Sequence, residues 1–330
     1  MRIRSALAVF ALGVFFSLPA FAQTAPTIYV GLVSITPSNA PVLAANDGGV
    51  FKKYNLDVKP LVMSGSSTAV AALLSGNVNL VSMAGSGLIN AHLGGSDAVM
   101  IAGMVNFAPY ELVVAKDIRR FEDLKGKKLG IARFGGSADF LARWGLEKNG
   151  LKPGKDVTIM QTGGNPERVA AIMQGAIQAT LLEQAFAQEA KKAGLHSLLD
   201  YSTAGLDYQH NGIGSTKSYM DKNRDAMVRF MKAMVEGIHK FKTDRAFGIK
   251  VLERHLRTSD PQVAQTAYDY YAPKTATVPY VNIKGMKFVL DTIADTNPKA
   301  KAAKPEDMVD HRALQEVEAS GFVKQIAAGK

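Results

Sequence analysis

The sequence predicts an α/β fold made of two similar halves, and three observations indicate it. Short apolar runs alternate with helical patterns along most of the 330 residues. This alternation occurs twice, and residues of the first block recur in the second at a constant offset of 99 positions. The loops that follow the apolar runs are rich in glycine and serine. Strands that alternate with helices form a mainly parallel sheet, with ligands beyond the carboxyl ends of the strands.

The first block contains predicted strands and helices in alternation. Apolar runs of strand length occupy residues 27–33, 56–63, 80–83, 99–105 and 111–115. Helical patterns occupy residues 40–54, 68–74 and 88–93. Gly76 ends the second of these helices, since glycine is the usual residue just past a helix end.

The second block repeats this alternation, and helices alone follow it. Its predicted strands occupy residues 128–133, 157–162, 177–182 and 196–199, and its helices occupy residues 137–149, 166–173 and 186–192. Beyond residue 215 an apolar stripe recurs at steps of three and four, at Met227, Met231, Met234, Ile238 and Phe241. This spacing is typical of the core-facing side of a long helix, which is a simpler interpretation than a methionine-rich binding surface.

The two blocks resemble each other residue by residue. Asp57-Val58 matches Asp156-Val157, and residues 70–78 match residues 169–177. Two copies are too few for a solenoid, so two similar lobes with a site between them are the natural interpretation. Chance similarity between helix–glycine–strand units is the alternative that the residues leave open.

The composition excludes several functional classes. The absence of cysteine excludes disulfides, thiolate nucleophiles and zinc–sulfur sites, and the six histidines lack metal-ligand spacing. We therefore expect no metal and no cofactor. The formal net charge of +10 is dispersed rather than gathered in a stripe, so we expect no nucleic-acid partner.

The N-terminus has the layout of a secretory signal peptide. Arg2 and Arg4 precede an almost wholly apolar run at residues 6–18, and Ala20-Phe21-Ala22 is a cleavage site of the Ala-x-Ala type. We expect cleavage after Ala22, export to the periplasm and, without a cysteine, no lipid anchor. A buried or anchoring N-terminal helix is the alternative.

The candidate ligand site lies in the loops at the strand ends. These loops start helices, where backbone N–H groups, hydroxyls and the positive end of the helix dipole can bind an anion without a metal. The candidate ligand-binding residues are Ser34, Thr36, Ser38, Asn39, Gly65, Ser66, Ser67, Ser86, Phe134, Gly136, Ser137, Asn165, Arg168, Glu183 and Tyr208. The alternative for each loop is that its serine or asparagine caps the following helix and binds no ligand.

Catalytic patterns are poor. The sequence contains no Gly-x-Ser-x-Gly, no Walker sequence and no full Gly-x-Gly-x-x-Gly. Glu183 is the one carboxylate expected inside the cleft, and general acid–base catalysis needs a partner group. We therefore predict a binding protein rather than an enzyme.

The chain resembles the periplasmic solute-binding proteins of ABC importers, in the nitrate, sulfonate and bicarbonate group, also called the thiamine-pyrimidine-synthase-like family. The matching stretches span about residues 28 to 323, and their order is more specific than any one of them. They are residues 49–58, 64–67, 124–130, 163–168, 223–225 and 303–307.

The resemblance implies a type II periplasmic-binding-protein fold, with two α/β lobes joined by a two-stranded hinge and a ligand cleft between them. It implies a first lobe of residues 27–114 and 213–330 and a second lobe of residues 115–212. The implied function is capture of a small anionic organic solute (a sulfonate, carboxylate or similar) by a monomer and its delivery to an ABC permease in the inner membrane.

One alternative function follows from the same resemblance. The family's yeast enzymes make a thiamine pyrimidine precursor, so an exported enzyme or a ligand-sensing module related to that synthesis is conceivable. Those enzymes need a cysteine-rich motif, and this chain has no cysteine.

Overall fold

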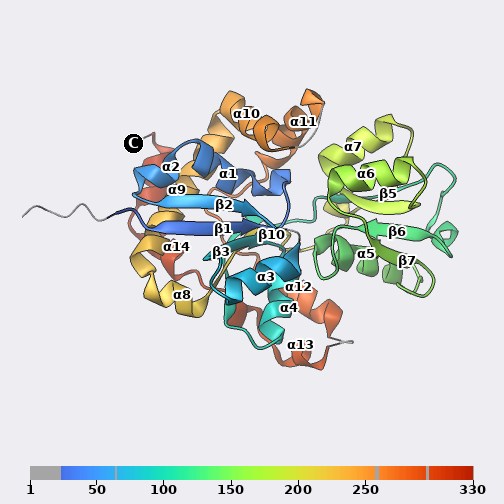
Figure 1. Ribbon diagram of the computed structural model, residues 1–330, viewed down its shortest axis with the longest axis horizontal. Helices are drawn as coiled ribbons and strands as arrows, with labels where there is room; N and C mark the ends of the chain where they lie inside the picture. The colour runs from blue at the N-terminus through green and yellow to red at the C-terminus, as the bar shows by residue number, and fades with distance from the viewer. Residues whose placement is uncertain (1–23, 64, 257–259, 295–296, 330) are drawn as a thin grey trace, which may run out of the picture.

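The strands form two five-stranded sheets with the same arrangement (Figure 1). The computed structural model describes residues 24–63, 65–256, 260–294 and 297–329. The first sheet has the order β2-β1-β3-β10-β4 and the second the order β7-β6-β8-β5-β9. In each sheet the first three strands are parallel, and the fourth (β10 or β5) is antiparallel to both of its neighbours. The order is therefore duplicated, as expected from the sequence repeat.

The bounds of the elements are as follows. The strands are β1 (Thr27–Leu32), β2 (Asp57–Val62), β3 (Leu80–Met83), β4 (Ala98–Val105), β5 (Tyr110–Val114), β6 (Lys128–Ile131), β7 (Thr158–Gln161), β8 (Ala179–Glu183), β9 (His196–Asp200) and β10 (Asn211–Thr216). The α-helices are α1 (Ala40–Asp47), α2 (Val50–Lys53), α3 (Ser66–Leu74), α4 (Gly85–Leu93), α5 (Ser137–Lys148), α6 (Asn165–Met173), α7 (Gln184–Lys192), α8 (Lys217–Lys222), α9 (Arg224–Thr243), α10 (Arg245–His255), α11 (Pro261–Tyr271), α12 (Ile283–Ile293), α13 (Pro298–Ala302), α14 (Arg312–Ala319) and α15 (Phe322–Ala327). Short 3₁₀ helices occupy Pro37–Asn39, Phe121–Leu124, Tyr201–Thr203 and Pro305–Met308.

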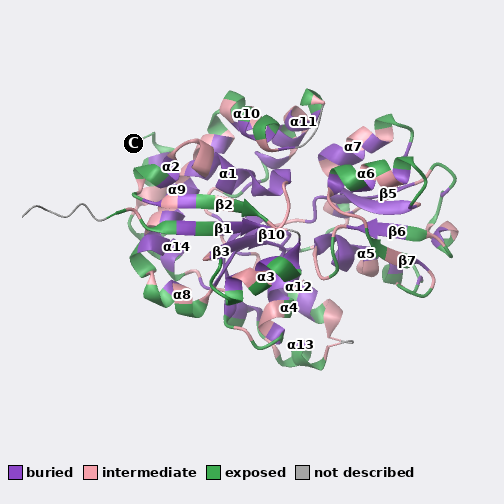
Figure 2. Ribbon diagram, in the orientation of Figure 1, coloured by how far each residue is buried: buried purple, intermediate pink, exposed green. Residues whose placement is uncertain are grey.

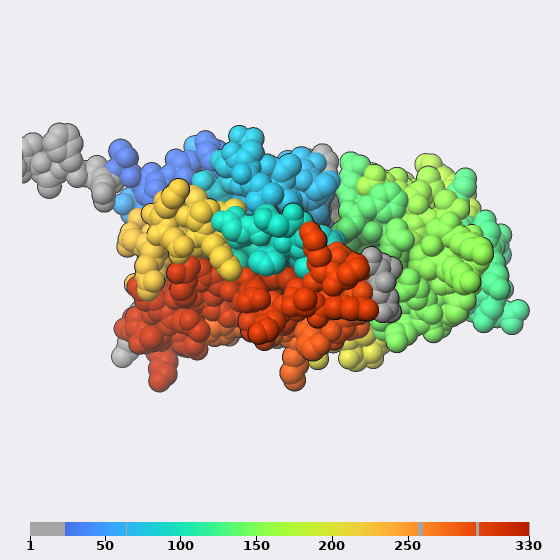
Figure 3. Space-filling model, turned by 90° about the horizontal axis from the view of Figure 1, so that it is seen from below, coloured from blue at the N-terminus to red at the C-terminus, as the bar shows by residue number. Residues whose placement is uncertain are grey.

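Each sheet and its helices make one lobe. The first lobe contains both ends of the described chain, and the second lobe is a continuous insertion between β4 and β10 (Figures 1 and 3). The lobes touch, because α11 packs against α7 and the ring of Phe288 meets the rings of Phe140 and Trp144.

The predicted alternation of strands and helices matches the structure, with a few differences at element ends. The expected helix at 40–54 is divided into α1 and α2, since Gly49 adopts a left-handed conformation (φ 69°) that interrupts the helix. The glycines at 85 and 87 lie in the first turn of α4 rather than in a loop. The apolar stripe from Met227 to Phe241 is fully buried on α9, which confirms its role in the core.

The two crossings between lobes lie slightly upstream of the expected positions. β5 pairs inside the second sheet, so the chain first crosses between Val105 and Tyr110, whereas the resemblance implies a boundary at 114–115. The return crossing precedes β10. Gly212 and Gly214 lie within this strand, where an added Cβ at Gly212 would collide with the carbonyl oxygen of Ala102. These glycines therefore permit close packing in the sheet.

Burial follows this layered arrangement (Figure 2). The strands nearest the centre of each sheet are buried, and the exposed residues lie on the outer helices and on parts of the edge strands β2 and β7. Among the described residues, no helix is both long enough and apolar enough to cross a membrane.

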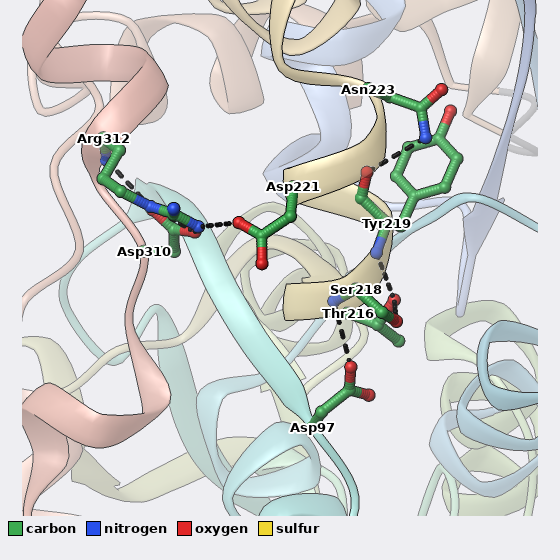
Figure 4. A network of polar contacts seen from close by, with 8 residues as sticks. All are labelled: Asp97, Thr216, Ser218, Tyr219, Asp221, Asn223, Asp310 and Arg312. Carbon is green, nitrogen blue, oxygen red and sulfur yellow. Dashed lines mark hydrogen bonds and ion pairs between the residues drawn. The ribbon is translucent and has the colours of Figure 1, made fainter.

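Within the first lobe, a polar network joins the C-terminal segment to α8 (Figure 4). Arg312 donates hydrogen bonds to Asp221 on α8 at 2.7 Å and to Asp310 at 2.6 Å. The start of α8 is fixed by Thr216, which accepts from the N–H of Tyr219, and by Asp97, which accepts from the N–H of Ser218. Burial raises the pKa of Asp310, but the hydrogen bonds and charge of Arg312 outweigh it and lower this pKa below its usual value.

We predict that Arg312→Ala destabilises the protein by about 1–3 kcal/mol at neutral pH, because it leaves the buried Asp310 carboxylate without its main donor. The folded-state pKa of Asp310 is lowered, so this stabilisation is present above the unfolded pKa of about 3.9 and is lost as the pH falls through the folded pKa. Urea denaturation at several pH values measures the difference from wild type. Arg245→Ala, which breaks an exposed pair with Asp269, is the control, with a loss of less than about 1 kcal/mol. An equal loss in both variants contradicts the prediction.

Candidate functional site

A cleft of about 340 Å³ lies between the two lobes. It is lined at the carboxyl ends of β1, β2, β6, β7 and β8, where an open α/β sheet binds ligands. Its volume is typical of a site for a small molecule. Of the predicted site residues, those that line the cleft are Ser34, Thr36, Gly65, Ser66, Gly136, Ser137, Asn165 and Glu183.

Three of the helices that begin at this cleft have a glycine at the N-cap position. The N-cap residues of α3, α5 and α6 are Gly65, Gly136 and Gly164, and all three line the cleft. A glycine has no side chain with which to cap the first-turn N–H groups, and Ser66, Ser137 and Asn165 are the first helical residues rather than the caps. By contrast, Asp244 caps α10 through its carboxylate. The cleft therefore faces helix N-termini whose positive ends are not shielded by a cap side chain.

The loop before α3 meets the second lobe at Gly65. This glycine has a φ of 91°, and an added Cβ would collide with the side chain of Arg133 from the second lobe. Only glycine combines this backbone conformation with such a close approach. Arg133 itself lines the cleft and is exposed, so it adds a positive charge at the edge of the site.

The Glu183 carboxyl joins the two lobes. It lies at the end of β8 in the second lobe and is 1% exposed. It accepts hydrogen bonds from Tyr271 (2.6 Å) and Ser38 (3.1 Å), and Thr36 also hydrogen-bonds to it. All three hydroxyls belong to the first lobe. Burial raises the pKa of Glu183 above its usual value, although the hydroxyls and the charge of Arg168 oppose this shift.

His210 extends this contact along the return crossing. Its Nε2 lies 3.0 Å from Ser38 Oγ in the first lobe, and its Nδ1 lies 3.0 Å from Ser137 Oγ in the second. Burial lowers the pKa of His210 to about 3, so the ring is neutral at physiological pH and carries one N–H. With that proton on Nε2, His210 donates to Ser38, which donates to Glu183, while Nδ1 accepts from Ser137. Tyr208 donates to Ser137 at 3.0 Å and completes the chain.

Arg168 holds the loop that starts α6. It is 2% exposed and donates to the carbonyl oxygen of Gly163 and to Oδ1 of Asn165, which also accepts from the N–H of Glu183. Its Nε has no partner among the described residues. Burial lowers the pKa of Arg168, against the opposing influence of Tyr110 and Glu183. A role for Arg168 in ligand binding stays a prediction.

The other predicted residues lie around the cleft rather than on its wall. Ser38 and Tyr208 belong to the hydrogen-bonded chain, and Asn39 is buried and donates to the carbonyl oxygen of Ser34. Ser86 donates across the lobes to the carbonyl oxygen of Gly135. Ser67 and Phe134 are exposed.

Sequence reasoning missed several residues of the site. Tyr110, Phe186 and His210 line the cleft, and Tyr271 holds Glu183. Tyr110 and His210 lie at the two crossings between the lobes. A first crossing predicted at residues 105–110 instead of 114–115 would have placed Tyr110 next to the cleft. Tyr271 lies on the late helix α11, where no sequence signal pointed to the cleft.

The polar groups of the cleft are mainly hydrogen-bonding groups. The cleft offers backbone N–H groups and hydroxyls, and the oxygens of its one buried carboxyl face hydroxyls of the opposite lobe. Within the described ranges, no group of three or more histidine, aspartate or glutamate side chains is arranged to hold a metal ion.

Comparisons with known proteins agree with this architecture. The family model described as "NMT1/THI5 like" matches residues 36–244. A putative binding protein of Bacillus subtilis (strain 168), YtlA, is 25% identical over 264 residues, which are 78% of this chain and 79% of YtlA.

Two solved structures share the fold. The alkanesulfonate-binding protein SsuA from Xanthomonas axonopodis pv. citri, bound to MOPS, has a TM-score of 0.69 and 17% identity, covering 88% of this chain and 96% of that one. The periplasmic nitrate-binding protein NrtA from Synechocystis PCC 6803 has a TM-score of 0.67 and 16% identity, covering 90% of each chain. The predicted periplasmic-binding-protein fold is confirmed.

We predict that Tyr271→Phe separates the lobes, because the Glu183 carboxyl loses its shortest inter-lobe donor. The loss to the closed arrangement is about 1–3 kcal/mol. Small-angle scattering measures the result as a larger radius of gyration. Tyr268→Phe on the same helix loses a bond to Lys242 within one lobe and is the matched control, with no change. Identical scattering from Tyr271→Phe and wild type contradicts the prediction.

Proposed function

The chain belongs to the NMT1/THI5-like family, and from this premise we propose that it is the substrate-binding component of an ABC importer. Its ligand is a small organic solute that carries an oxyanion, such as a sulfonate or a carboxylate. It binds the solute without turnover and delivers it to a permease in the inner membrane.

One observation carries the proposal. Three helices, from both lobes, point uncapped N-termini into one cleft between those lobes. An anionic head group placed there meets backbone donors and three helix dipoles. Tyr110 and Phe186 line the same cleft and suit an apolar tail. The two structural relatives are an alkanesulfonate-binding and a nitrate-binding protein, and both of these ligands are oxyanions, which supports this class.

The lobe boundaries of this proposal follow the sheets. The first lobe comprises residues 24–105 and 211–329, and the second lobe the residues between 110 and 205, with hinge segments at 106–109 and 206–210. A ligand that bridges both lobes binds the closed arrangement best and shifts the population toward it. The contact of Glu183 with three hydroxyls adds to closure from the protein's side.

The Gly136 position tests the anion site. Its φ of −89° is accessible to any residue, and an added Cβ would meet its nearest atoms at ordinary distances of 3.5 and 3.7 Å. Asp and Asn at this N-cap position both cap α5, so the fold gains stability in either variant. Only Asp adds a negative charge beside the bound anion.

We predict that Gly136→Asp binds the solute more weakly than Gly136→Asn by roughly 2 kcal/mol, from two unit charges about 8 Å apart at an effective dielectric constant of about 20. Mass spectrometry of the natively purified protein identifies the co-purifying solute, and calorimetry with that solute measures both variants. Equal affinities, or a cationic co-purifying solute, contradict an oxyanion site.

Export is the second testable part of the proposal. The proposed signal peptide, residues 1–22, lies outside the described residues. We predict Gln23 as the N-terminus of the mature periplasmic protein, since Ala20-Phe21-Ala22 has the small residues that signal peptidase requires. Edman sequencing of the periplasmic fraction measures it. A mature protein that retains Met1 contradicts the prediction.

A further inference from the structure

A carboxyl group lines the cleft in which we place an anion. Glu183 contributes to the cleft wall beside the N-terminal ends of α3, α5 and α6, and it is 1% exposed. An ionised carboxylate repels a second negative charge most strongly where the surroundings have a low dielectric constant. A proton on the carboxyl removes this repulsion, and a neighbouring anion in turn raises the affinity of the carboxyl for that proton. The anion and a proton therefore favour each other at this site.

The charged and titratable groups around Glu183 allow it to take up this proton. Tyr271 and Tyr270 on α11 and Tyr110 on β5 are neutral, because burial raises the pKa of all three phenols. The charge of Arg168 on α6 favours the ionised carboxyl, but its guanidinium donates hydrogen bonds to the loop that starts α6. Burial outweighs this charge and the hydroxyl donors, and it raises the pKa of Glu183.

A chain of hydrogen bonds connects this carboxyl to a second point on the cleft wall. Oε2 of Glu183 lies 3.1 Å from Oγ of Ser38, which lies 3.0 Å from Nε2 of His210. Nδ1 of His210 lies 3.0 Å from Oγ of Ser137, which lines the cleft as the first residue of α5. A hydroxyl both donates and accepts, and a neutral imidazole carries its proton on either nitrogen. The chain can therefore run in two directions.

The protonation state of Glu183 decides the direction. The ionised carboxyl accepts from Ser38, Ser38 accepts from the Nε2–H of His210, and the hydroxyl proton of Ser137 is directed at Nδ1. The protonated carboxyl donates to Ser38, Ser38 donates to Nε2, and the Nδ1–H donates to Ser137. In the second state the Ser137 hydroxyl is free to donate to an anion in the cleft. Its other acceptor, the carbonyl oxygen of His210, lies at a longer distance of 3.4 Å.

We propose that the cleft binds its anion together with one proton, which enters the chain at Ser137 and is balanced by a proton held on Glu183. This inference rests on the proposed transport function and makes pH a regulator of the same site. Each proton moves by one step. A proton from the solvent bonds to Ser137 Oγ, the Ser137 proton moves to Nδ1 of His210, the Nε2 proton moves to Ser38, and the Ser38 proton moves to Glu183. Every O–H or N–H bond that breaks in the chain is replaced, so the chain gains one proton and His210 stays neutral.

Calorimetry in buffers of different ionisation enthalpy tests the coupling, because proton uptake adds heat in proportion to that enthalpy. Ethanesulfonate, a strong acid with no proton to titrate, is the first probe, and the solute that mass spectrometry identifies in the natively purified protein is the second. We expect uptake of up to one proton per solute bound. Between the pKa of Glu183 in the free protein and its higher pKa in the complex, the Kd rises by up to about tenfold per pH unit, and it is constant below and above that range.

Two matched variants assign the proton to Glu183. Glu183→Gln is neutral at every pH, so we expect it to take up no proton and to have a Kd independent of pH. Glu111→Gln is the control, because Glu111 is a buried carboxyl on the adjacent strand β5 that pairs with Lys191 outside the cleft lining. It should keep the pH dependence of wild type. No proton uptake by wild type at any pH, or undiminished uptake by Glu183→Gln, overturns the inference. A protein that binds neither solute refutes the transport function itself.

Nitrogen-15 NMR of the imidazole rings tests the chain and needs no solute. The shifts of Nδ1 and Nε2 identify which nitrogen carries the proton, and backbone assignment distinguishes His210 from the other five histidines of the sequence. We expect the proton on Nε2 when Glu183 is ionised and on Nδ1 when the pH falls below the pKa of Glu183. Ser38→Ala removes the link between the carboxyl and the ring, so its His210 should keep one tautomer. A single tautomer in wild type across this pH range, or an unaltered switch in Ser38→Ala, overturns the proposed chain.

Discussion

The arrangement of the two lobes depends on the burial of one carboxyl group. Glu183 comes from the second lobe, and its hydroxyl partners Thr36, Ser38 and Tyr271 all come from the first. A carboxyl group buried without hydrogen bonds is costly, so this side chain is satisfied either by the opposite lobe or by water. The Glu183 carboxyl is therefore hydrogen-bonded to the first lobe when the lobes are closed and to water when they are open. The neutral His210 ring links the same contact to Ser137 and hence to the start of α5.

Helices without a side-chain cap begin at the cleft. Helices such as α10 satisfy their first-turn N–H groups with an aspartate, which stabilises a helix by about 1 kcal/mol relative to alanine. Three helices at the cleft have a glycine N-cap and lack this side-chain acceptor, which costs only about a few tenths of a kcal/mol relative to aspartate. Their donors remain directed at the space between the lobes.

The sequence predicted the order of strands and helices and part of the cleft, but not the contacts between residues far apart in the chain. The spacing of apolar residues, the turn residues and the 99-residue repeat predicted the α/β alternation and the positions of α3, α5 and α6. These elements are predictable because residues close together in the sequence determine them. The helix-start residues Ser66, Ser137 and Asn165 were also predicted to lie near a ligand, and they line the cleft. The role of Tyr271 was not predictable, because its hydroxyl reaches Glu183 from a helix 88 residues away in sequence. The strand at 110–114 was assigned to the first block because an apolar run does not reveal which sheet it joins.

The position of β10 inside the first sheet has a consequence for the order of folding. This strand lies between β3 and β4, yet it follows the entire second lobe in the chain. As the protein is synthesised, the first sheet lacks its antiparallel strand β10 until the inserted lobe is complete. Closing so long a loop is entropically costly and slows folding when the intervening chain is unstructured. A folded second lobe shortens that loop, since its two ends meet where the N–H of His210 bonds the carbonyl oxygen of Val105. The second lobe must therefore fold before β10 can readily join the first sheet. A mutation that slows folding of the second lobe delays folding of the first lobe as well.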